Sequence, residues 1–414
     1  MKLITELWLF YNHNFRHNKD RLMKSFLAII FLCMAFTVNA VVIEAVDLEG
    51  ATKTKKSAII RWASIPIGEN ISQEELDFVI EKIHRISQLN LIDVKFEKGI
   101  LKIKIEDKWS LFPVPIVSQS GQYFSRGFLL YENNFLGRLG TFAPGVFWTN
   151  SGLNALVYWQ EDNIISKNVG MKVILLHKND LTQFERNDNI EKEFESRLDS
   201  VILTPNFQHG NFDHKLGPIF LKRMIYEGQE KVFDSKRYGL YYRQHYRGFK
   251  KLPVLFDGFN ATYDFFFIPK GEDYDYLTSG EVVYLDPIDR DFLQYGLHFN
   301  YTNNSSYLSP KTLGGNQGYR GYDRESLPTQ WNYGGFVEYK KHLFGTVYSS
   351  VFYEYNQSKL IKPVMDGATL SESTVGINTA YYFQKISIPA LIWEYAYNVD
   401  DKSHHFLFNL GLTL

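Results

Sequence analysis

Cysteine is almost absent from this chain of 414 residues, in which Cys33 is the only one. Cys33 lies inside a segment that we interpret below as a signal peptide, so the mature protein would contain no cysteine and no disulfide bond. An excess of charge of either sign is also missing, because the formal net charge is -1. This balance gives no indication of a nucleic-acid partner, and we predict none.

Long hydrophobic runs are missing as well. Charged residues make up 22% of the chain and the mean hydropathy is -0.24, which argues against a bundle of membrane helices. The apolar stretch from Phe26 to Phe36 is too short to span a membrane as a helix. If the chain crosses a membrane, it must therefore do so with strands.

Residues 1–40 are predicted to be a signal peptide region. Lys24 supplies the charged start, and Val38-Asn39-Ala40 supplies an acceptable small-residue cleavage site. Translation that begins at Met23 would account for the polar, basic residues 1–22, and an unusually long charged region is the alternative. An exported chain without later hydrophobic spans fits a bacterial periplasmic or outer-membrane destination.

Motifs that carry catalysis or bind a cofactor are not found. Gly314-Gly315 lacks the lysine and the serine or threonine of a phosphate-binding loop, and no Gly-x-Ser-x-Gly elbow occurs. His404-His405 could suggest a metal, but we interpret the pair as surface histidines. We therefore predict that the protein is not an enzyme and that it has neither a metal site nor a cofactor.

Aromatic residues, in contrast, are abundant. They make up 16% of the chain, with 27 Tyr and 33 Phe. Outer-membrane barrels combine many aromatics with middling hydropathy, because one residue in two faces lipid and aromatic girdles mark both interfaces. An aromatic-rich soluble β-protein is the alternative at this stage.

Apolar and polar residues alternate along several segments, most clearly in 292–301, 331–340, 375–383 and 405–414. Large aromatics occupy one face of each segment, and glycine and small polar residues occupy the other. A soluble sandwich also has one apolar and one polar face. Large aromatics opposite small polar groups nevertheless favour lipid outside and a wet lumen inside.

The predicted architecture is an all-β transmembrane barrel of about sixteen antiparallel strands, with fourteen as an alternative, preceded by a small α/β domain. The charged segment 181–196 is either one more strand or an extracellular loop. The predicted boundaries are a linker at 41–55, the α/β domain at 56–107, a linker at 108–122 that contains Pro113 and Pro115, and the barrel at 123–414.

The α/β domain is predicted from four local patterns. Ala58–Trp62 is expected to be a strand, and Ser72–Glu75 is a capping box that begins a helix. Residues 92–96 and 101–105 alternate as two further strands. This order of strand, helix, strand and strand, just before a barrel, resembles a POTRA domain, and a generic α/β plug or linker domain is the alternative.

Three motifs, in order, resemble those of the BamA/TamA superfamily of outer-membrane assembly and translocation proteins. They are Tyr131-Glu-Asn-Asn-Phe-Leu-Gly137, Gly318-Tyr-Arg-Gly-Tyr322 and Phe352-Tyr-Glu-Tyr-Asn356. The first resembles the pattern that follows the first barrel strand. The third is a partial match, because Glu354 replaces an aspartate and Asn356 replaces a glycine. The resemblance covers roughly residues 56–414.

The resemblance implies that Arg320, Gly321 and Tyr322 belong to a loop six that folds into the lumen. Counting along the alternating strands places Glu338 and Glu354 on the lumen face, where a guanidinium could pair with one or both. The alternative is that Arg320 lies on an ordinary solvated loop.

The resemblance also implies a function, which is the insertion or translocation of client proteins at a seam between the first and last strands. We expect this seam at Phe128 and Leu130 on one side and at Phe406, Phe408 and Leu410 on the other. The expected partners are outer-membrane lipids, a client protein and an accessory periplasmic protein bound through residues 56–107. The expected location is the bacterial outer membrane, with the N-terminal domain in the periplasm. A passive pore and a structural surface antigen are the alternatives.

Overall fold

The computed structural model describes residues 41–84, 86, 88–121, 123–166, 168–186, 189–251, 255–270, 273–303, 311–313, 319–322, 327–361, 367–382 and 389–410. The predicted signal peptide region, Gly318 and Leu414 lie outside these residues. The chain divides into two compact units. Apart from residues 50–64 and 88–90, which belong to the barrel unit, the small N-terminal unit covers the described residues up to 105.

The N-terminal unit is built around a three-stranded sheet and one helix. Strand β5 (Ile100–Asp107) lies between β2 (Ala45–Glu49), with which it pairs in parallel, and β4 (Leu89–Glu97). The short strands β1 (Val41–Val42) and β3 (Asn70–Ile71) pair with each other. Two strands therefore lie in the segment 41–55, which the sequence analysis assigned to a linker.

Helix α4 (Gln73–His84) begins at the predicted capping box. The backbone N–H of Ser72 donates to the Glu75 carboxylate at 2.8 Å, and the N–H of Glu75 donates to the Ser72 hydroxyl at 3.2 Å. Leu76, Val79 and Ile83 share one face and are buried. The local sequence is sufficient to start this helix and to orient it.

The prediction of a strand at Ala58–Trp62 is wrong, because these residues belong to helix α3 (Lys56–Ala63). A short apolar run fits a helix and a strand equally well, so its periodicity could not decide between them. The helix ends at Ser64, whose left-handed backbone (φ 56°) lets its N–H return to the carbonyl of Arg61. Apart from the two-residue strands β1 and β3, the order before the barrel is therefore strand, helix, helix, strand, strand.

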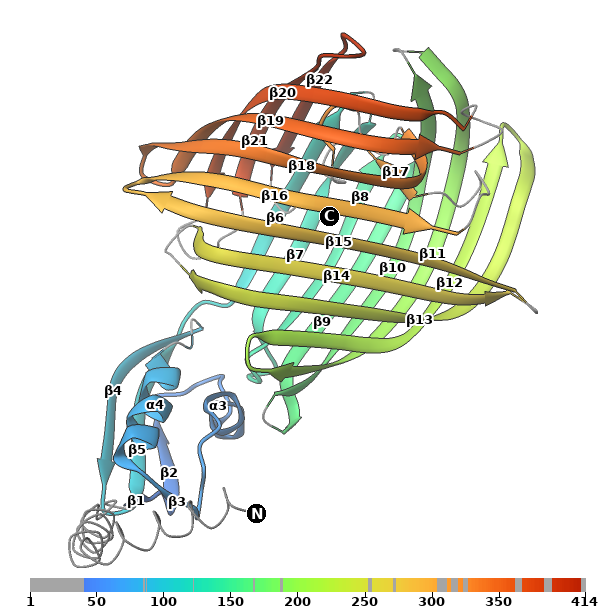
Figure 1. The fold of residues 1–414 in the computed structure, drawn as a ribbon. Helices are drawn as coiled ribbons and strands as arrows, with labels where there is room; N and C mark the ends of the chain where they lie inside the picture. Colours follow the sequence, from blue (N-terminus) through green and yellow to red (C-terminus); the bar gives the residue numbers. More distant parts are fainter. Residues whose placement is uncertain are drawn as a thin grey trace, which may run out of the picture. The chain divides into compact units, whose positions relative to one another are not determined.

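The second unit contains a closed antiparallel barrel, in which each strand pairs with the next and the last pairs with the first (Figure 1). The short β17 (Lys311–Leu313) pairs only with β18, so sixteen full strands make up the wall. They are β6 (Leu111–Ser120), β7 (Tyr123–Phe135), β8 (Gly140–Thr149), β9 (Gly152–Ser166), β10 (Val169–Arg186), β11 (Asn189–His209), β12 (Phe212–Glu227), β13 (Glu230–Lys251), β14 (Phe256–Lys270), β15 (Asp273–Ile288), β16 (Asp291–Thr302), β18 (Leu327–Phe344), β19 (Val347–Leu360), β20 (Thr369–Tyr382), β21 (Pro389–Asn398) and β22 (His404–Leu410).

The barrel begins earlier than predicted. Strand β6 lies within residues 108–122, which the sequence analysis assigned to a linker because of Pro113 and Pro115. It pairs with β7 along its whole length and with β22 at the closure of the barrel. Proline is tolerated in a strand whose missing N–H faces away from an intact ladder. The two prolines therefore lie in the first barrel strand and not in a linker.

The two faces of the wall follow the predicted alternation. On β19, Phe352, Glu354 and Asn356 are buried, whereas Tyr353 and Tyr355 between them are exposed. Strands β16, β18, β20 and β22 show the same pattern, with exposed aromatic and aliphatic side chains outside. The segment 181–196 contains no separate strand, because it forms the facing ends of β10 and β11. No described helix has the length and apolar character required to cross a membrane.

Candidate functional site

Arg320 is held inside the barrel by the two carboxylates that the sequence pattern singled out. It lies in the connection between β16 and β18, of which the structure describes residues 311–313 and 319–322. Its Nη1 is 3.2 Å from Glu338 Oε2, and its Nε is 3.3 Å from Glu354 Oε2. The backbone N–H of Arg320 also donates to Glu354 Oε2 at 3.1 Å. Side chain and backbone of the loop are thus tied to β18 and β19 together.

Sequence reasoning missed two further contacts of the same guanidinium. Glu394 Oε2, on β21, lies 3.6 Å from Arg320 Nη1. Arg320 also makes a cation–π contact with Phe352, whose ring centroid lies 3.5 Å from Arg320 Cζ. The signal for Glu394 was present in the alternation, since Trp393 and Tyr395 on either side face outward.

The charges around Arg320 form a connected network. Lys340 Nζ donates to Glu338 Oε1 at 2.6 Å, and the Ser350 hydroxyl donates to the same oxygen at 2.5 Å. Glu338, Glu354 and Glu394 are each less than 10% exposed at their side chains, and Arg320 is 17% exposed. Three buried carboxylates require a cation beside them, because an uncompensated buried charge is strongly destabilising. Of the residues that the structure describes, Arg320 is the one paired with all three.

The residues on either side of Arg320 fit tightly against the wall. A Cβ added to Gly321 would lie 2.2 Å from Thr374 Oγ1, so only glycine fits. The Asn398 side chain donates to the carbonyl of Gly321 at 3.3 Å, and the Tyr322 hydroxyl donates to the Glu372 carboxylate. Gly321 and Tyr322 therefore bind the loop to β20 and also to β21, the strand that contacts Arg320 through Glu394.

The two tyrosines beside Arg320 also pack into an apolar cluster. Tyr319 is completely buried, and Thr374 Oγ1 donates to its hydroxyl at 2.7 Å. Tyr319 and Tyr322 share this cluster with Phe194 of β11, Ile225 of β12 and Leu360 of β19. The described part of the loop thus connects strands from both halves of the wall.

The first and last strands meet at a seam of four described pairs. Leu407, Phe408, Asn409 and Leu410 of β22 face Ser120, Gln119, Ser118 and Val117 of β6, respectively. Phe408 and Leu410 lie on β22 in these pairs, and the exposed Phe406 precedes them on the same strand. On the other side of the seam the expectation is wrong. Phe128 and Leu130 lie on β7, the second strand, because β6 precedes it.

The motif Tyr131–Gly137 lies at the end of β7, where it holds a segment that precedes the barrel in sequence. We name residues 50–64 the strap. Lys53 Nζ lies 2.8 Å from Glu132 Oε2, and the side-chain amide of Asn134 donates to the Thr54 hydroxyl at 2.7 Å. Asn134 is fully buried. The motif thus lies at the end of the second barrel strand and not after the first. Its polar residues contact the strap.

The end of the same motif leaves room for the strap backbone. Gly137 has a φ of 69°, and a Cβ there would lie 2.0 Å from the carbonyl oxygen of Lys53. The N–H of Lys55 donates to the Gly137 carbonyl at 2.8 Å. Farther along the strap, Arg61 contacts Glu161 of β9 at 3.6 Å and donates to the carbonyl of Asn163. The strap is therefore fixed to β7, to the turn that follows β7 and to β9.

Asp107 accepts hydrogen bonds from the first residues of the strap. Its carboxylate accepts the backbone N–H groups of Thr52 and Lys53 at 2.7 and 2.6 Å, together with the Thr54 hydroxyl. Burial opposes ionisation, but these hydrogen bonds outweigh it and hold the pKa of Asp107 below its ordinary value. The ionised carboxylate therefore stabilises the strap.

We expect the strap to loosen on acidification. A folded-state pKa below the unfolded value means that the stabilisation is present above about pH 4 and is lost as pH falls through the folded pKa. Hydrogen exchange at the amides of Thr52 and Lys53, corrected for intrinsic rates, should show protection falling over that range. Asp107→Asn should give weak protection at neutral pH with little pH dependence. Equal protection of both proteins at every pH would contradict this role for Asp107.

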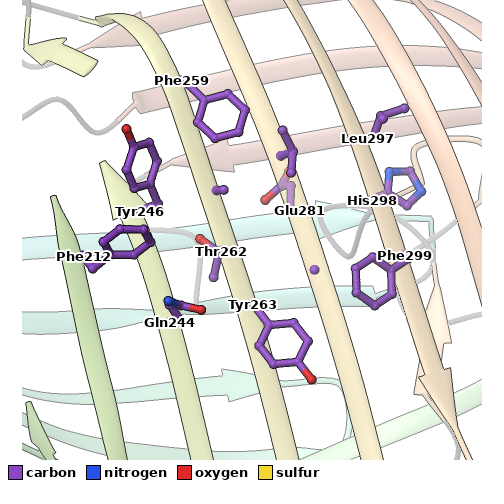
Figure 2. Close-up of a pocket in the computed structure, with 13 residues that line it drawn as sticks. Phe212, Gln244, Tyr246, Phe259, Thr262, Tyr263, Glu281, Leu297, His298 and Phe299 are labelled. Carbon is purple, nitrogen blue, oxygen red and sulfur yellow. The ribbon is translucent and has the colours of Figure 1, made fainter. Parts of the chain in front are cut away.

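The outer wall carries a depression of about 890 Å³ across β12 to β16. The rings of Phe212, Tyr246, Phe259, Tyr263 and Phe299 surround it in Figure 2. These rings belong to the outward face, and Phe212, Phe259, Tyr263 and Phe299 are at least 36% exposed. The depression therefore belongs to the aromatic outer surface and not to the loop or the seam.

Neither a protein-family model nor a curated protein matches this sequence. Solved structures do match. BamA from Haemophilus ducreyi lacking POTRA domains 1–3 aligns with a TM-score of 0.65 at 12% identity, over 90% of this chain and 85% of that one. The chain has the BamA fold. CdiB from Acinetobacter baumannii and CdiB from Escherichia coli also align, each with a TM-score of 0.61 and 12% identity, over 90% of this chain and 74% and 76% of theirs.

This likeness confirms the predicted fold, a closed antiparallel β-barrel with sixteen full strands like that of BamA. Five full strands, β18 to β22, follow the connection that carries Arg320. At 12% identity the comparison shows the fold, and the function is argued separately below.

Proposed function

We propose that this protein is a bacterial outer-membrane barrel that inserts or translocates client proteins at the seam between β6 and β22. The observation that carries the proposal is the anchoring of Arg320 by three carboxylates and an aromatic ring inside a barrel of the BamA fold. The sequence resemblance to assembly and translocation proteins supports the same function.

At the seam, the client would pair with a strand edge by β-augmentation. An extended segment can add to an exposed sheet edge through backbone hydrogen bonds, with little demand on its side chains. In lipid a free edge is costly, so a seam that opens must be filled quickly by another strand. The role of the anchored loop in this scheme is to brace the wall while the seam exchanges partners.

We further propose that the N-terminal unit is a single POTRA-like domain in the periplasm. Its order of strand, helix, helix, strand and strand supports this assignment when α3 is included. Such a domain would receive the client or an accessory protein before the barrel does. The strap, which contains α3, would then tie this domain to the end of β7.

Deleting the gene provides the test. We expect one or a few surface or secreted proteins to fall on the order of tenfold in their mature location, as quantitative proteomics of envelope and culture medium would show. Re-expression of the parent should restore them. Unchanged proteins together with altered uptake of small solutes would favour the passive pore, and no change in either would favour a structural role at the surface.

A further inference from the structure

Two prolines lie in the strand that forms one side of the seam. Pro113 and Pro115 of β6 pair with Leu130 and Phe128 of β7 without any shift in register. In an antiparallel sheet, the backbone groups of successive residues point alternately to the two neighbouring strands. Pro113 and Pro115 are two residues apart, so the backbone groups of both point the same way.

Two hydrogen bonds show to which neighbouring strand the backbone groups of Pro113 and Pro115 point. Asn133 donates its N–H to the carbonyl of Ser110 at 3.0 Å, which continues the β6–β7 ladder by one pair. Even-numbered residues of β6 therefore direct their backbone groups to β7. Phe124, which faces Gln119, donates its N–H away from β6 to the side chain of Asn150 at 3.0 Å. The odd-numbered residues of β6 therefore direct their backbone groups to β22.

The donors that the prolines lack are thus missing from the seam and not from the β6–β7 ladder, since proline has no backbone N–H. Val117 and Gln119 keep their N–H groups, and they face Leu410 and Phe408 of β22. All four described seam pairs lie in this second half of β6. Any strand that lies beside Pro113 and Pro115 can donate to their carbonyl groups but receives no hydrogen bond in return.

We propose that Pro113 and Pro115 divide the seam into a closed half at 117–120 and an exchangeable half at 111–116. The partner that fits the exchangeable half is an extended segment of an incoming polypeptide. Because no strand that pairs there receives N–H donors at these two positions, such a strand is held weakly and can be replaced. This inference rests on the proposed function, since it assigns the position at which a client enters.

The test restores the missing donors with the double substitution Pro113→Val and Pro115→Val in the full-length protein, folded in nanodiscs. Hydrogen exchange is measured on peptides that contain Val117, Gln119 and residues 404–410. Two added hydrogen bonds should slow seam exchange on the order of tenfold or more. Pro218→Val is the matched control, because Pro218 is an exposed wall proline on β12, away from the seam, and should leave these peptides unchanged.

The outcomes separate this inference from the proposed function. Unchanged or faster seam exchange in a folded double variant overturns the role of the prolines, whatever happens to the client. Slower exchange with client handling at the parental rate supports the prolines and contradicts exchange at the seam as the function. Slower exchange together with reduced client handling supports both. If the double variant does not fold, Pro115→Val alone is judged by the same criteria.

Discussion

Arg320→Ala should release the loop from the lumen wall and lower the activity on the client on the order of tenfold or more. Without the guanidinium, Glu338, Glu354 and Glu394 remain close together, and among the described residues Lys340 is the cation paired with them. Removing one partner of a buried ion pair costs roughly 3 kcal/mol or more, and the water that reaches Arg320 places this site at the low end. We expect a barrel that still forms, with a loop that limited proteolysis cuts faster.

Two comparisons make the Arg320 result specific. Arg243→Ala removes a guanidinium that is bidentate to Asp264 across β13 and β14 and does not contact the described loop residues, so it should leave loop proteolysis unchanged. Adding Glu354→Gln to Arg320→Ala relieves part of the carboxylate repulsion. Stability should then recover in part while the loop stays sensitive to protease. Parental loop cleavage and parental activity in Arg320→Ala would show that the anchor hypothesis is wrong.

Locking the seam should abolish client handling while leaving the barrel folded. Ser118 and Asn409 face each other across β6 and β22, and the backbone groups of Ser118 point to β7. Such a non-hydrogen-bonded pair has Cα atoms about 4.5 Å apart, which a disulfide can bridge. With Cys33 in the predicted signal peptide, Ser118→Cys and Asn409→Cys would introduce the only cysteines of the mature chain. Client insertion or export should fall to background under oxidation and recover with reductant.

The matched control for the lock shares one of its substitutions. Ser118→Cys with Ser125→Cys bridges β6 to β7, a pair that the proposed mechanism never opens. It should therefore leave client handling and the heat-dependent gel shift of the folded barrel unchanged. Normal client handling by the locked seam variant would contradict exchange at the seam. If ion conductance is then the only activity, the protein is a passive pore, and if neither activity is found, a structural role gains support.

The sequence predicted the wall well because its information there is local. Alternation along one strand is sufficient to place Glu338 and Glu354 on the lumen face, and both contact Arg320. The same logic applied to β21 would have placed Glu394 inside, but nothing in the sequence indicates that β21 comes close to the loop. Distances between side chains of different strands depend on how the barrel closes around the loop.

The errors arose where local patterns fit two structures. Ala58–Trp62 has the apolar residues of a short strand and also those of one helical face, and a contact between Arg61 and β9 accompanies the helix. Pro113 and Pro115 resembled a linker because proline normally interrupts a ladder. They are accommodated in β6 because their backbone nitrogens point away from β7, a fact that depends on which strands lie on each side.

By itself, therefore, the sequence determined a barrel of about sixteen strands, the faces of those strands and the loop that carries Arg320, because a period of two residues is a local property. Only the tertiary structure decided that β6 closes the barrel against β22 and that Glu394 completes the anchor. It also decided that the motif Tyr131–Gly137 binds the strap. Each of these depends on hydrogen bonds and ion pairs between residues distant in the chain, which no local pattern encodes.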